Sequence, residues 1–427
     1  MKMKNGNSLK SRECSYRRTV LPNGIRVITE RMDSVRSVTT GVWIMAGTRK
    51  ETEKNNGLFH LLEHMIFKGT ETRSAYDIAV SLETLGGQLN GFTEKEMTCF
   101  YAVVLDHHLK KSVEILADIV QNPSLNESDL FKEKQIVCEE IANLEDTPED
   151  LVQEFFVQHV FGHHPLGLPI LGSRESIDGL TPKDLRHTHE TWYTPDRIII
   201  TAAGHVDHDY FVQLVEEYFD GNPYIRTENT ETVHTSPHLS KIFYTETSQS
   251  HVCVGYPICA FQDRQKYPMI MLNILLGSGM SSRLFQRLRE DEGLAYAVYS
   301  CLDFWSDTGV WNLYAGTSPG QTSCILDIFD AEINRLMREG IAEQDLNNIK
   351  SQLAGNMVLN LEDSTNRMNR LAKFEAYTET YLPPDETIQY IRSMTVDDLM
   401  KTVNLFFSEN RKYITMLEPL SMKRQVS

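Results

Sequence analysis

Two histidines and a glutamate near residue 60 are the side chains of this sequence best suited to chemistry. His60, Glu63 and His64 form an H-x-x-E-H pattern inside an apolar stretch. In an α-helix, residues three and four apart lie on one face, so both imidazoles would point to a common place. That arrangement suits tetrahedral zinc, and it would let Glu63 act as general base on a zinc-bound water.

The rest of this segment predicts a buried helix over residues 58–68. Its other sides are covered by apolar residues, namely Leu58, Phe59, Leu61, Leu62, Met65 and Ile66. Burying two imidazoles and a carboxylate without partners would cost on the order of several kcal/mol, which a bound cation would offset. The alternative is an accidental pattern whose histidines make ordinary hydrogen bonds in a core.

A second helix is expected over residues 127–145, with Asn126 as its N-cap and Asp129 in its first turn. Glu133 and Glu140 lie seven residues apart, almost in line beside the apolar stripe of this helix. Either carboxylate could complete a His, His, Glu zinc site. The alternative is a solvated acidic helix with lysine neighbours.

Alternating strand patterns and helical patterns together predict an α+β fold with largely antiparallel sheets. Strands are expected at residues 24–31, 38–46, 98–105, 241–246, 251–256 and 310–315, and further helices at 110–120 and 266–276. Residues 222–240 are rich in Pro, Thr, Ser, Asn and Glu without an apolar period, which is typical of a linker. We therefore expect an N-terminal zinc-binding domain over 1–221 and a C-terminal domain without zinc over 241–427.

The two halves of the chain resemble each other over a short stretch. Asp129-Leu130 followed by Leu144-Glu145-Asp146-Thr147 parallels Asp345-Leu346 followed by Leu361-Glu362-Asp363-Ser364, an offset of 361 − 144 = 217 residues. This offset indicates two homologous domains. It places the counterpart of His60 and His64 near residues 277–281, which contain no ligand residue, so one Zn²⁺ per chain is expected.

The composition argues against binding nucleic acid and against crossing a membrane. The chain has 427 residues, a formal net charge of −17 and 41% hydrophobic residues. Nucleic-acid binding requires clustered positive charge, and a membrane span requires an apolar run of roughly 18–20 residues, which is missing. A cationic peptide is a more natural partner for such a chain.

The seven cysteines are odd in number, scattered and without a C-x-x-C pair, which favours a reducing compartment. The N-terminal basic residues are not followed by an apolar segment, so a secretory signal is not expected. We expect a cytoplasmic protein, with an organellar matrix as the alternative.

Several further segments accompany the H-x-x-E-H pattern, and with it they resemble one known family. They are residues 86–93 (GGQLNGFT), 144–148 (LEDTP), 165–172 (PLGLPILG) and 193–195 (YTP). From about Thr19 to Glu418 the sequence is similar to the pitrilysin, insulinase and mitochondrial processing peptidase family of inverted-zincin metallopeptidases. The separation of 140 − 64 = 76 residues is that of the processing-peptidase branch. The resemblance implies that Glu140 is the third zinc ligand and that Glu133 assists catalysis from behind the ligands.

The same resemblance implies three residues that would handle the substrate. Asn90 would contact the backbone of a peptide that pairs with an exposed edge strand, expected near residues 93–100. Arg289 and Tyr296 would bind substrate and donate hydrogen bonds to the oxyanion. Residues 275–280 lack the glycine-rich insertion of the non-catalytic α subunit of mitochondrial processing peptidase.

The resemblance implies a zinc-dependent endopeptidase that cuts peptides or unfolded segments inside a closed chamber. Each chain would form half of a clamshell, and two chains would close it as a homodimer. One alternative is a non-catalytic chamber or scaffold subunit, against which the complete set of zinc residues speaks. Another is a dedicated maturase of one peptide precursor.

Overall fold

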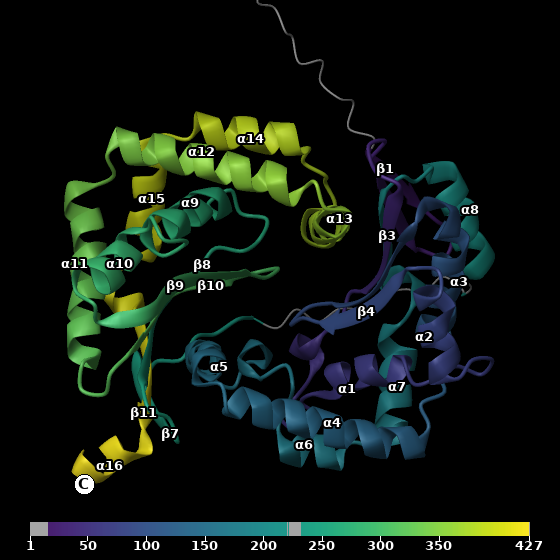
Figure 1. Cartoon of the computed structure of the whole chain (residues 1–427), viewed down its shortest axis with the longest axis horizontal. Coiled ribbons are helices and arrows are strands. Elements are labelled where there is room, and N and C mark those ends of the chain that lie inside the picture. The colour runs from purple at the N-terminus through teal and green to yellow at the C-terminus, as the bar shows by residue number, and fades with distance from the viewer. Residues whose placement is uncertain (1–15, 220, 222–231, 427) are drawn as a thin grey trace, which may run out of the picture.

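The computed structural model describes residues 16–219, 221 and 232–426, and these form two sheets with helices around them (Figure 1). The first sheet has the spatial order β1 (Tyr16–Val20), β2 (Arg26–Arg31), β6 (Ile198–Gly204), β3 (Ser37–Ile44), β5 (Thr98–Leu105) and β4 (Gln88–Thr93). β2 and β6 pair in parallel, and all other neighbours in this sheet are antiparallel. β4 is therefore an edge strand.

The second sheet repeats the arrangement of the first. Its spatial order is β7 (Ser240–Thr245), β11 (Tyr413–Pro419), β8 (Ser250–Ile258), β10 (Gly309–Thr317) and β9 (Ala295–Phe304). β7 and β11 pair in parallel and the others antiparallel, as in the order β2, β6, β3, β5, β4. The mixed α/β fold with two similar halves is thus confirmed. Residues 222–231 of the expected linker lie outside the described residues, and the domain boundary stays a prediction.

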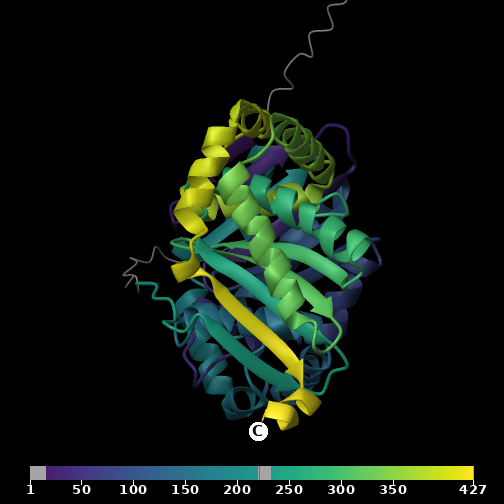
Figure 2. The same ribbon diagram turned by 90° about the vertical axis from the view of Figure 1, so that its left-hand side faces the viewer.

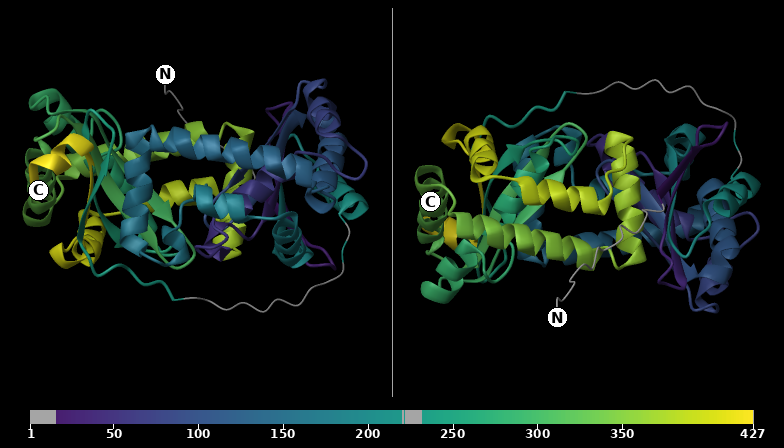
Figure 3. Two further views of the ribbon diagram at one scale, coloured as in Figure 1. Left: turned by 90° about the horizontal axis from the view of Figure 1, so that it is seen from below. Right: turned by 90° about the horizontal axis from the view of Figure 1, so that it is seen from above.

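The helices follow the same duplicated order. The first half contains α1 (Leu58–Ile66), α2 (Ala75–Glu83), α3 (Leu109–Gln121), α4 (Glu127–Glu145), α5 (Pro148–Phe161), α6 (Arg174–Gly179), α7 (Pro182–Trp192) and α8 (His208–Tyr218). The second half contains α9 (Lys266–Leu276), α10 (Arg283–Phe285), α11 (Thr322–Glu339), α12 (Glu343–Asn360), α13 (Ser364–Thr378), α14 (Pro384–Ser393), α15 (Val396–Phe406) and α16 (Leu420–Val426). The long helices α4 and α12 run along opposite faces of the molecule (Figure 3).

The two halves exchange one helix each. One face of the first sheet packs against α13, where Trp43 and Ile199 meet Met368 and Leu371. One face of the second sheet packs against α5, which buries Phe156 there with other apolar residues. Figure 1 shows both helices between the sheets, and Figure 2 shows α11 crossing the outer face of the second sheet. Because each apolar face is covered by the other half, neither sheet is buried by its own half alone.

Polar contacts also join the halves across this boundary. Arg18 of β1 forms an ion pair of 2.8 Å with Glu375 of α13, whose side chain is almost fully buried. Arg49 pairs with Asp307 in the β9–β10 turn at 2.6 Å. Thr39 hydrogen-bonds Ser364 at 2.7 Å.

Three details differ from the sequence-based expectations. Asn126 precedes α4, but its side chain caps no backbone N–H and instead donates to the Ser124 hydroxyl. The exposed edge strand is Gln88–Thr93, whereas residues 93–100 span the turn into the interior strand β5. The counterpart of α1 is α9, which ends before residues 277–281 because the connection to it is shorter; it too contains no His, Cys, Asp or Glu. No described helix is long and apolar enough to span a membrane.

Candidate metal centre

The helix α1 carries the H-x-x-E-H residues through the core of the first half. All of its residues except His64 are buried, as the apolar sequence requires. It lies between α4 and the edge strand β4 (Figure 1). Its polar face is therefore enclosed by two elements that bring further polar groups to it.

His60, His64 and Glu140 converge at this face. One ligand atom from each lies within 4.8 Å of the others. The His60 Nε2 is 3.5 Å from Glu140 Oε2, and the His64 Nε2 is 3.7 Å from Glu140 Oε1. Among the described residues, this is the one group of three or more His, Cys, Asp or Glu side chains that could hold a metal ion.

The residues fit a zinc ion in both distance and charge. Zinc bonds of 2.0–2.2 Å in a tetrahedron place neighbouring ligand atoms about 3.4 Å apart, close to the separations found here. Burial and the nearby His64 lower the pKa of His60 to about 3, so its imidazole is neutral and can offer a lone pair. Two imidazoles and one carboxylate are a ligand set typical of catalytic zinc.

Glu133 lies behind the ligands rather than among them. Its side chain is almost fully buried, and its Oε2 accepts from the His64 Nδ1 at 3.1 Å. Its other oxygen pairs with Lys68 Nζ at 2.8 Å. The hydrogen bond between Glu133 and His64 Nδ1 fixes the His64 ring with Nε2 facing Glu140. Carboxylates commonly orient metal-binding histidines in this way.

Glu63 is enclosed between α1 and the edge strand. Its Oε2 accepts from the Thr93 hydroxyl at 3.2 Å. The strand comes so near that a Cβ at Gly91 would lie 3.0 Å from Glu63 Oε1. Burial raises the pKa of Glu63 above its ordinary value, which suits a general base or acid near neutral pH.

Asn90 lies on β4 and is exposed. Its Oδ1 accepts from the Gly91 N–H at 2.8 Å, so the side chain folds back on the strand. Because β4 has one unpaired edge, its backbone is open to a further strand. This position is compatible with the expected role of Asn90 in holding a peptide.

Arg289 and Tyr296 are brought together, but not at the metal centre. The Arg289 guanidinium lies 4.5 Å from the centre of the Tyr296 ring, and Tyr296 is 77% exposed at the start of β9. Figure 1 shows α10 and β9 in the second half, away from α1 and α4. Within one chain the pair is therefore separate from the candidate metal ligands.

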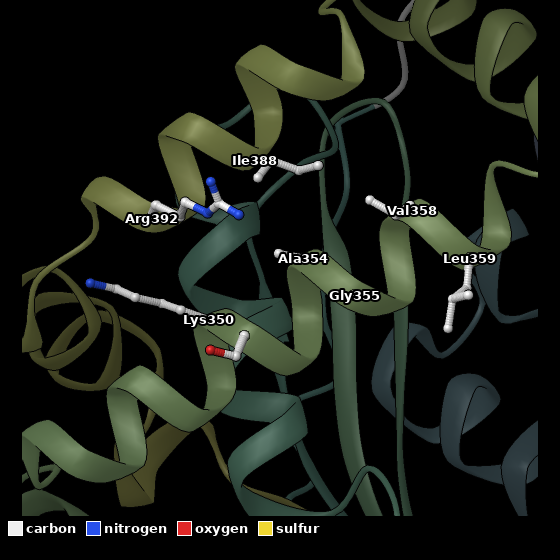
Figure 4. A pocket seen from close by; sticks show the side chains of 8 residues that line it. Lys350, Ala354, Gly355, Val358, Leu359, Ile388 and Arg392 are labelled. Atoms are coloured by element: carbon white, nitrogen blue, oxygen red, sulfur yellow. The ribbon is translucent and has the colours of Figure 1, made fainter. Parts of the chain in front are cut away.

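A surface hollow of about 510 Å³ lies between α12 and α14 (Figure 4). Its lining includes Lys350 and Arg392 over aliphatic side chains such as Val358 and Ile388. It contains no acid, histidine or cysteine, so its side chains cannot hold a metal or serve as a carboxylate base. The acids and histidines that this hollow lacks are found at the candidate metal centre on α1 and α4.

The sequence patterns predict no role for three residues that lie near the candidate metal centre. Lys68 follows the metal-binding residues on the expected side of the helix, so its spacing could have suggested the contact with Glu133. Thr93 and Gly91 belong to the GGQLNGFT segment, but nothing in the spacing shows that this segment passes Glu63. Their proximity depends on how β4 packs on α1.

Comparison with known proteins places these residues in context. The profile "Insulinase (Peptidase family M16)" matches residues 26–174, which include all three candidate ligands, and "Peptidase M16 inactive domain" matches residues 179–353, which include Arg289 and Tyr296. An uncharacterized zinc protease of Bacillus subtilis is 38% identical over 395 residues, covering 92% of this chain and 96% of that protein. One of Mycobacterium tuberculosis is 38% identical over 417 residues, covering 96% and 94%.

Solved structures share the fold. A protease from Helicobacter pylori superposes with a TM-score of 0.89 at 23% identity, covering 95% of this chain and 100% of the other. A peptidase M16 inactive domain from Pseudomonas fluorescens gives a TM-score of 0.86 at 17% identity, covering 95% and 98%.

Proposed function

Since the chain belongs to peptidase family M16, the insulinase family, we propose that it is a zinc-dependent endopeptidase whose metal is held by His60, His64 and Glu140. The observation that carries the proposal is the convergence of these side chains from two helices to within 4.8 Å. The buried carboxylate of Glu63 beside them completes the set needed for hydrolysis.

The residues divide the work of peptide hydrolysis. When bound, zinc supplies a Lewis acid that polarises a carbonyl and acidifies water. Glu63 takes the proton of the attacking water and passes it to the leaving amine. Glu133 keeps the His64 ring in place through the Nδ1 contact. Arg289 and Tyr296, supplied by the partner chain of a homodimer, bind the substrate and donate hydrogen bonds to the oxyanion.

The open edge of β4 supports an extended peptide as substrate. A peptide pairing there as an added strand passes Asn90 and comes beside Glu63, because Gly91 brings strand and carboxylate into contact. A homodimer that closes over this edge forms a chamber and excludes folded proteins. Of the alternatives, a scaffold subunit without activity would have no use for the complete ligand set. A dedicated maturase would differ in its substrate and not in its site.

Two substitutions separate the ligand from the base. Glu140→Gln is expected to lose most of its zinc because a ligand charge is removed, whereas Glu63→Gln should retain zinc and lose turnover. Metal analysis of both purified variants, together with cleavage of an unbiased peptide library with and without chelator, measures this. Equal zinc in both variants would contradict the ligand assignment, and full activity of Glu63→Gln would contradict the base.

The chamber has its own test. Because entry requires an extended chain, a folded domain should be spared and the same domain cut after it is unfolded by reduction or truncation. Digestion of the two forms under one buffer, followed by mass spectrometry, measures the difference. Similar cleavage of both forms would refute a chamber that excludes folded proteins.

A further inference from the structure

The helix that carries both histidines has no capping side chain of its own. α1 is preceded by Gly57 in the left-handed region, with φ of 88°. A Cβ at Gly57 would come 2.6 Å from the Leu171 carbonyl oxygen and from Ile177. The Ser, Thr, Asp or Asn side chains that usually accept the first free N–H groups of a helix are thereby excluded from this position.

Glu51 supplies the missing acceptor from outside the helix. Its carboxylate accepts from the backbone N–H of Phe59 at 2.7 Å and of Gly57 at 2.8 Å. It also accepts from the Asn56 side-chain amide at 2.8 Å. Only 2% of Glu51 is exposed. Burial raises the pKa of Glu51 to about 7, and the three donors act against this rise by favouring the ionised carboxylate.

Glu51 is itself fixed to the turn that ends the edge strand. Its backbone N–H bonds to the Thr48 carbonyl at 3.0 Å. The N–H groups of Thr48 and Arg49 bond to carbonyl groups of the β4–β5 turn at 3.3 and 2.7 Å. In that turn the buried Lys95 donates to the Leu168 carbonyl, and its charge favours the ionised form of Glu51. Glu51 thus links the strand expected to bind substrate with the helix expected to bind metal.

We propose that Glu51 is a positioning residue of the metal centre, which fixes the first turn of α1 and thereby the place of His60 relative to β4. His60 directly follows Phe59, whose N–H Glu51 holds. Loosening that turn would move His60 while His64, one turn later, stays against Glu133. The effect on catalysis rests on the proposed peptidase function, whereas the effect on the helix does not.

The test compares Glu51→Gln with Glu53→Gln. Glu51→Gln keeps the size of the side chain but replaces one carboxylate oxygen by an amide NH₂ group, which cannot accept a hydrogen bond from the backbone N–H groups. The second makes the same change at an exposed side chain that contacts the exposed His163, and should behave as wild type. In metal-free Glu51→Gln, amide hydrogen exchange over residues 57–61 should accelerate about 10-fold. Cobalt(II) should bind roughly 10-fold more weakly, with a changed absorption spectrum, and kcat should fall while KM changes little.

The contrary results are distinct. If Glu51→Gln lowers the melting temperature but leaves amide exchange in α1 and cobalt(II) affinity as in wild type, Glu51 merely stabilises the fold and the proposal is wrong. If wild type neither binds cobalt(II) nor cuts peptides, the proposed function fails, and the exchange comparison still decides the role of Glu51. Should Glu51→Gln not fold, Glu51→Asp, one methylene shorter, takes its place with the same expected direction and the same contrary result.

Discussion

Three carboxylates surround the two histidines, and their surroundings assign them different roles. Glu140 is 38% exposed and faces both imidazoles, so it is free to bind a cation. Glu133 is buried and already paired with Lys68 and His64. Glu63 is buried, and this burial raises its pKa although the Thr93 hydroxyl donates a hydrogen bond to it. In the proposed peptidase, environment rather than residue type would separate ligand, support and base.

The support by Glu133 can be measured. Glu133→Gln keeps a hydrogen-bond acceptor for His64 but removes the charge, so zinc affinity should fall by about 10- to 100-fold, less than in Glu140→Gln. Lys68→Met should show a smaller loss because Glu133 itself remains. Competition with a chromogenic chelator measures these affinities. Lys132→Met changes an exposed lysine of α4, the helix that carries Glu133, and is the matched control for Lys68→Met. Unchanged affinity in Glu133→Gln would remove the orienting role.

The sequence pattern predicts that His60, Glu63 and His64 share one helix face. It does not predict which carboxylate of α4 completes the site. The spacing of His60, Glu63 and His64 is local, and helical geometry alone places them on one face. The choice between Glu133 and Glu140 is not local, because both lie on the same line of α4. It depends on how α4 crosses α1, which the sequence pattern leaves open.

At the scale of elements, α9 occupies the position of α1 in the second half but carries a different polar group. Lys266 at its start is 7% exposed, and its ammonium lies 3.4 Å from the centre of the Phe261 ring and 5.2 Å from that of Phe374 on the exchanged helix α13. Burial, followed by the charge of Arg370, lowers the pKa of Lys266 to about 8. The Lys266 ammonium is thus enclosed by aromatic rings where the halves meet, with the Arg370 guanidinium over one of the same rings.

This burial gives stability a dependence on pH. Between pH 8 and about 10.5 the unfolded chain keeps the Lys266 proton and the folded chain releases it, so stability rises with pH. The free energy of unfolding of wild type minus that of Lys266→Met should therefore grow over this range, by on the order of 3 kcal/mol at most. Urea unfolding at a series of pH values measures it. Lys401→Met, at an exposed lysine, should show no such trend. A constant difference for Lys266→Met would refute the lowered pKa.

The elements themselves were largely predictable, while their pairing was not. The strand Thr98–Leu105 and the helices Glu127–Glu145 and Lys266–Leu276 match the expected bounds, although Asn126, the expected N-cap of Glu127–Glu145, makes no capping hydrogen bond. Nothing in the periods of α5 or α13 shows that each covers the sheet of the other half. An apolar helical face requires burial but does not specify its partner.

At the scale of the whole molecule, the separation of Arg289 and Tyr296 from the zinc ligands predicts complementation between chains. If each active site combines the zinc residues of one chain with this pair from its partner, Glu63→Gln and the double variant Arg289→Ala, Tyr296→Phe should each be nearly inactive. The first lacks the base, and the second lacks oxyanion donors worth about 2.7–4 kcal/mol in comparable sites. After subunit exchange, about half of the dimers are mixed and each has one intact site, so activity should rise toward about a quarter of wild type.

Native mass spectrometry provides the control for this experiment, because it shows whether mixed dimers have formed. Mixed dimers without regained activity would mean that the pair acts within its own chain or takes no part in catalysis. A protein that stays monomeric under assay conditions and is active would contradict the shared site directly.

The exchange of α5 and α13 also bears on how such a chain could arise. A single copy of the repeat would leave one face of its sheet bare, because the helix that covers this face belongs to the other copy. That copy would be stable only as a pair of subunits that trade helices, which is a domain-swapped dimer. The present chain corresponds to such a dimer joined into one polypeptide, in which one copy holds the candidate metal ligands and the other is released from that requirement.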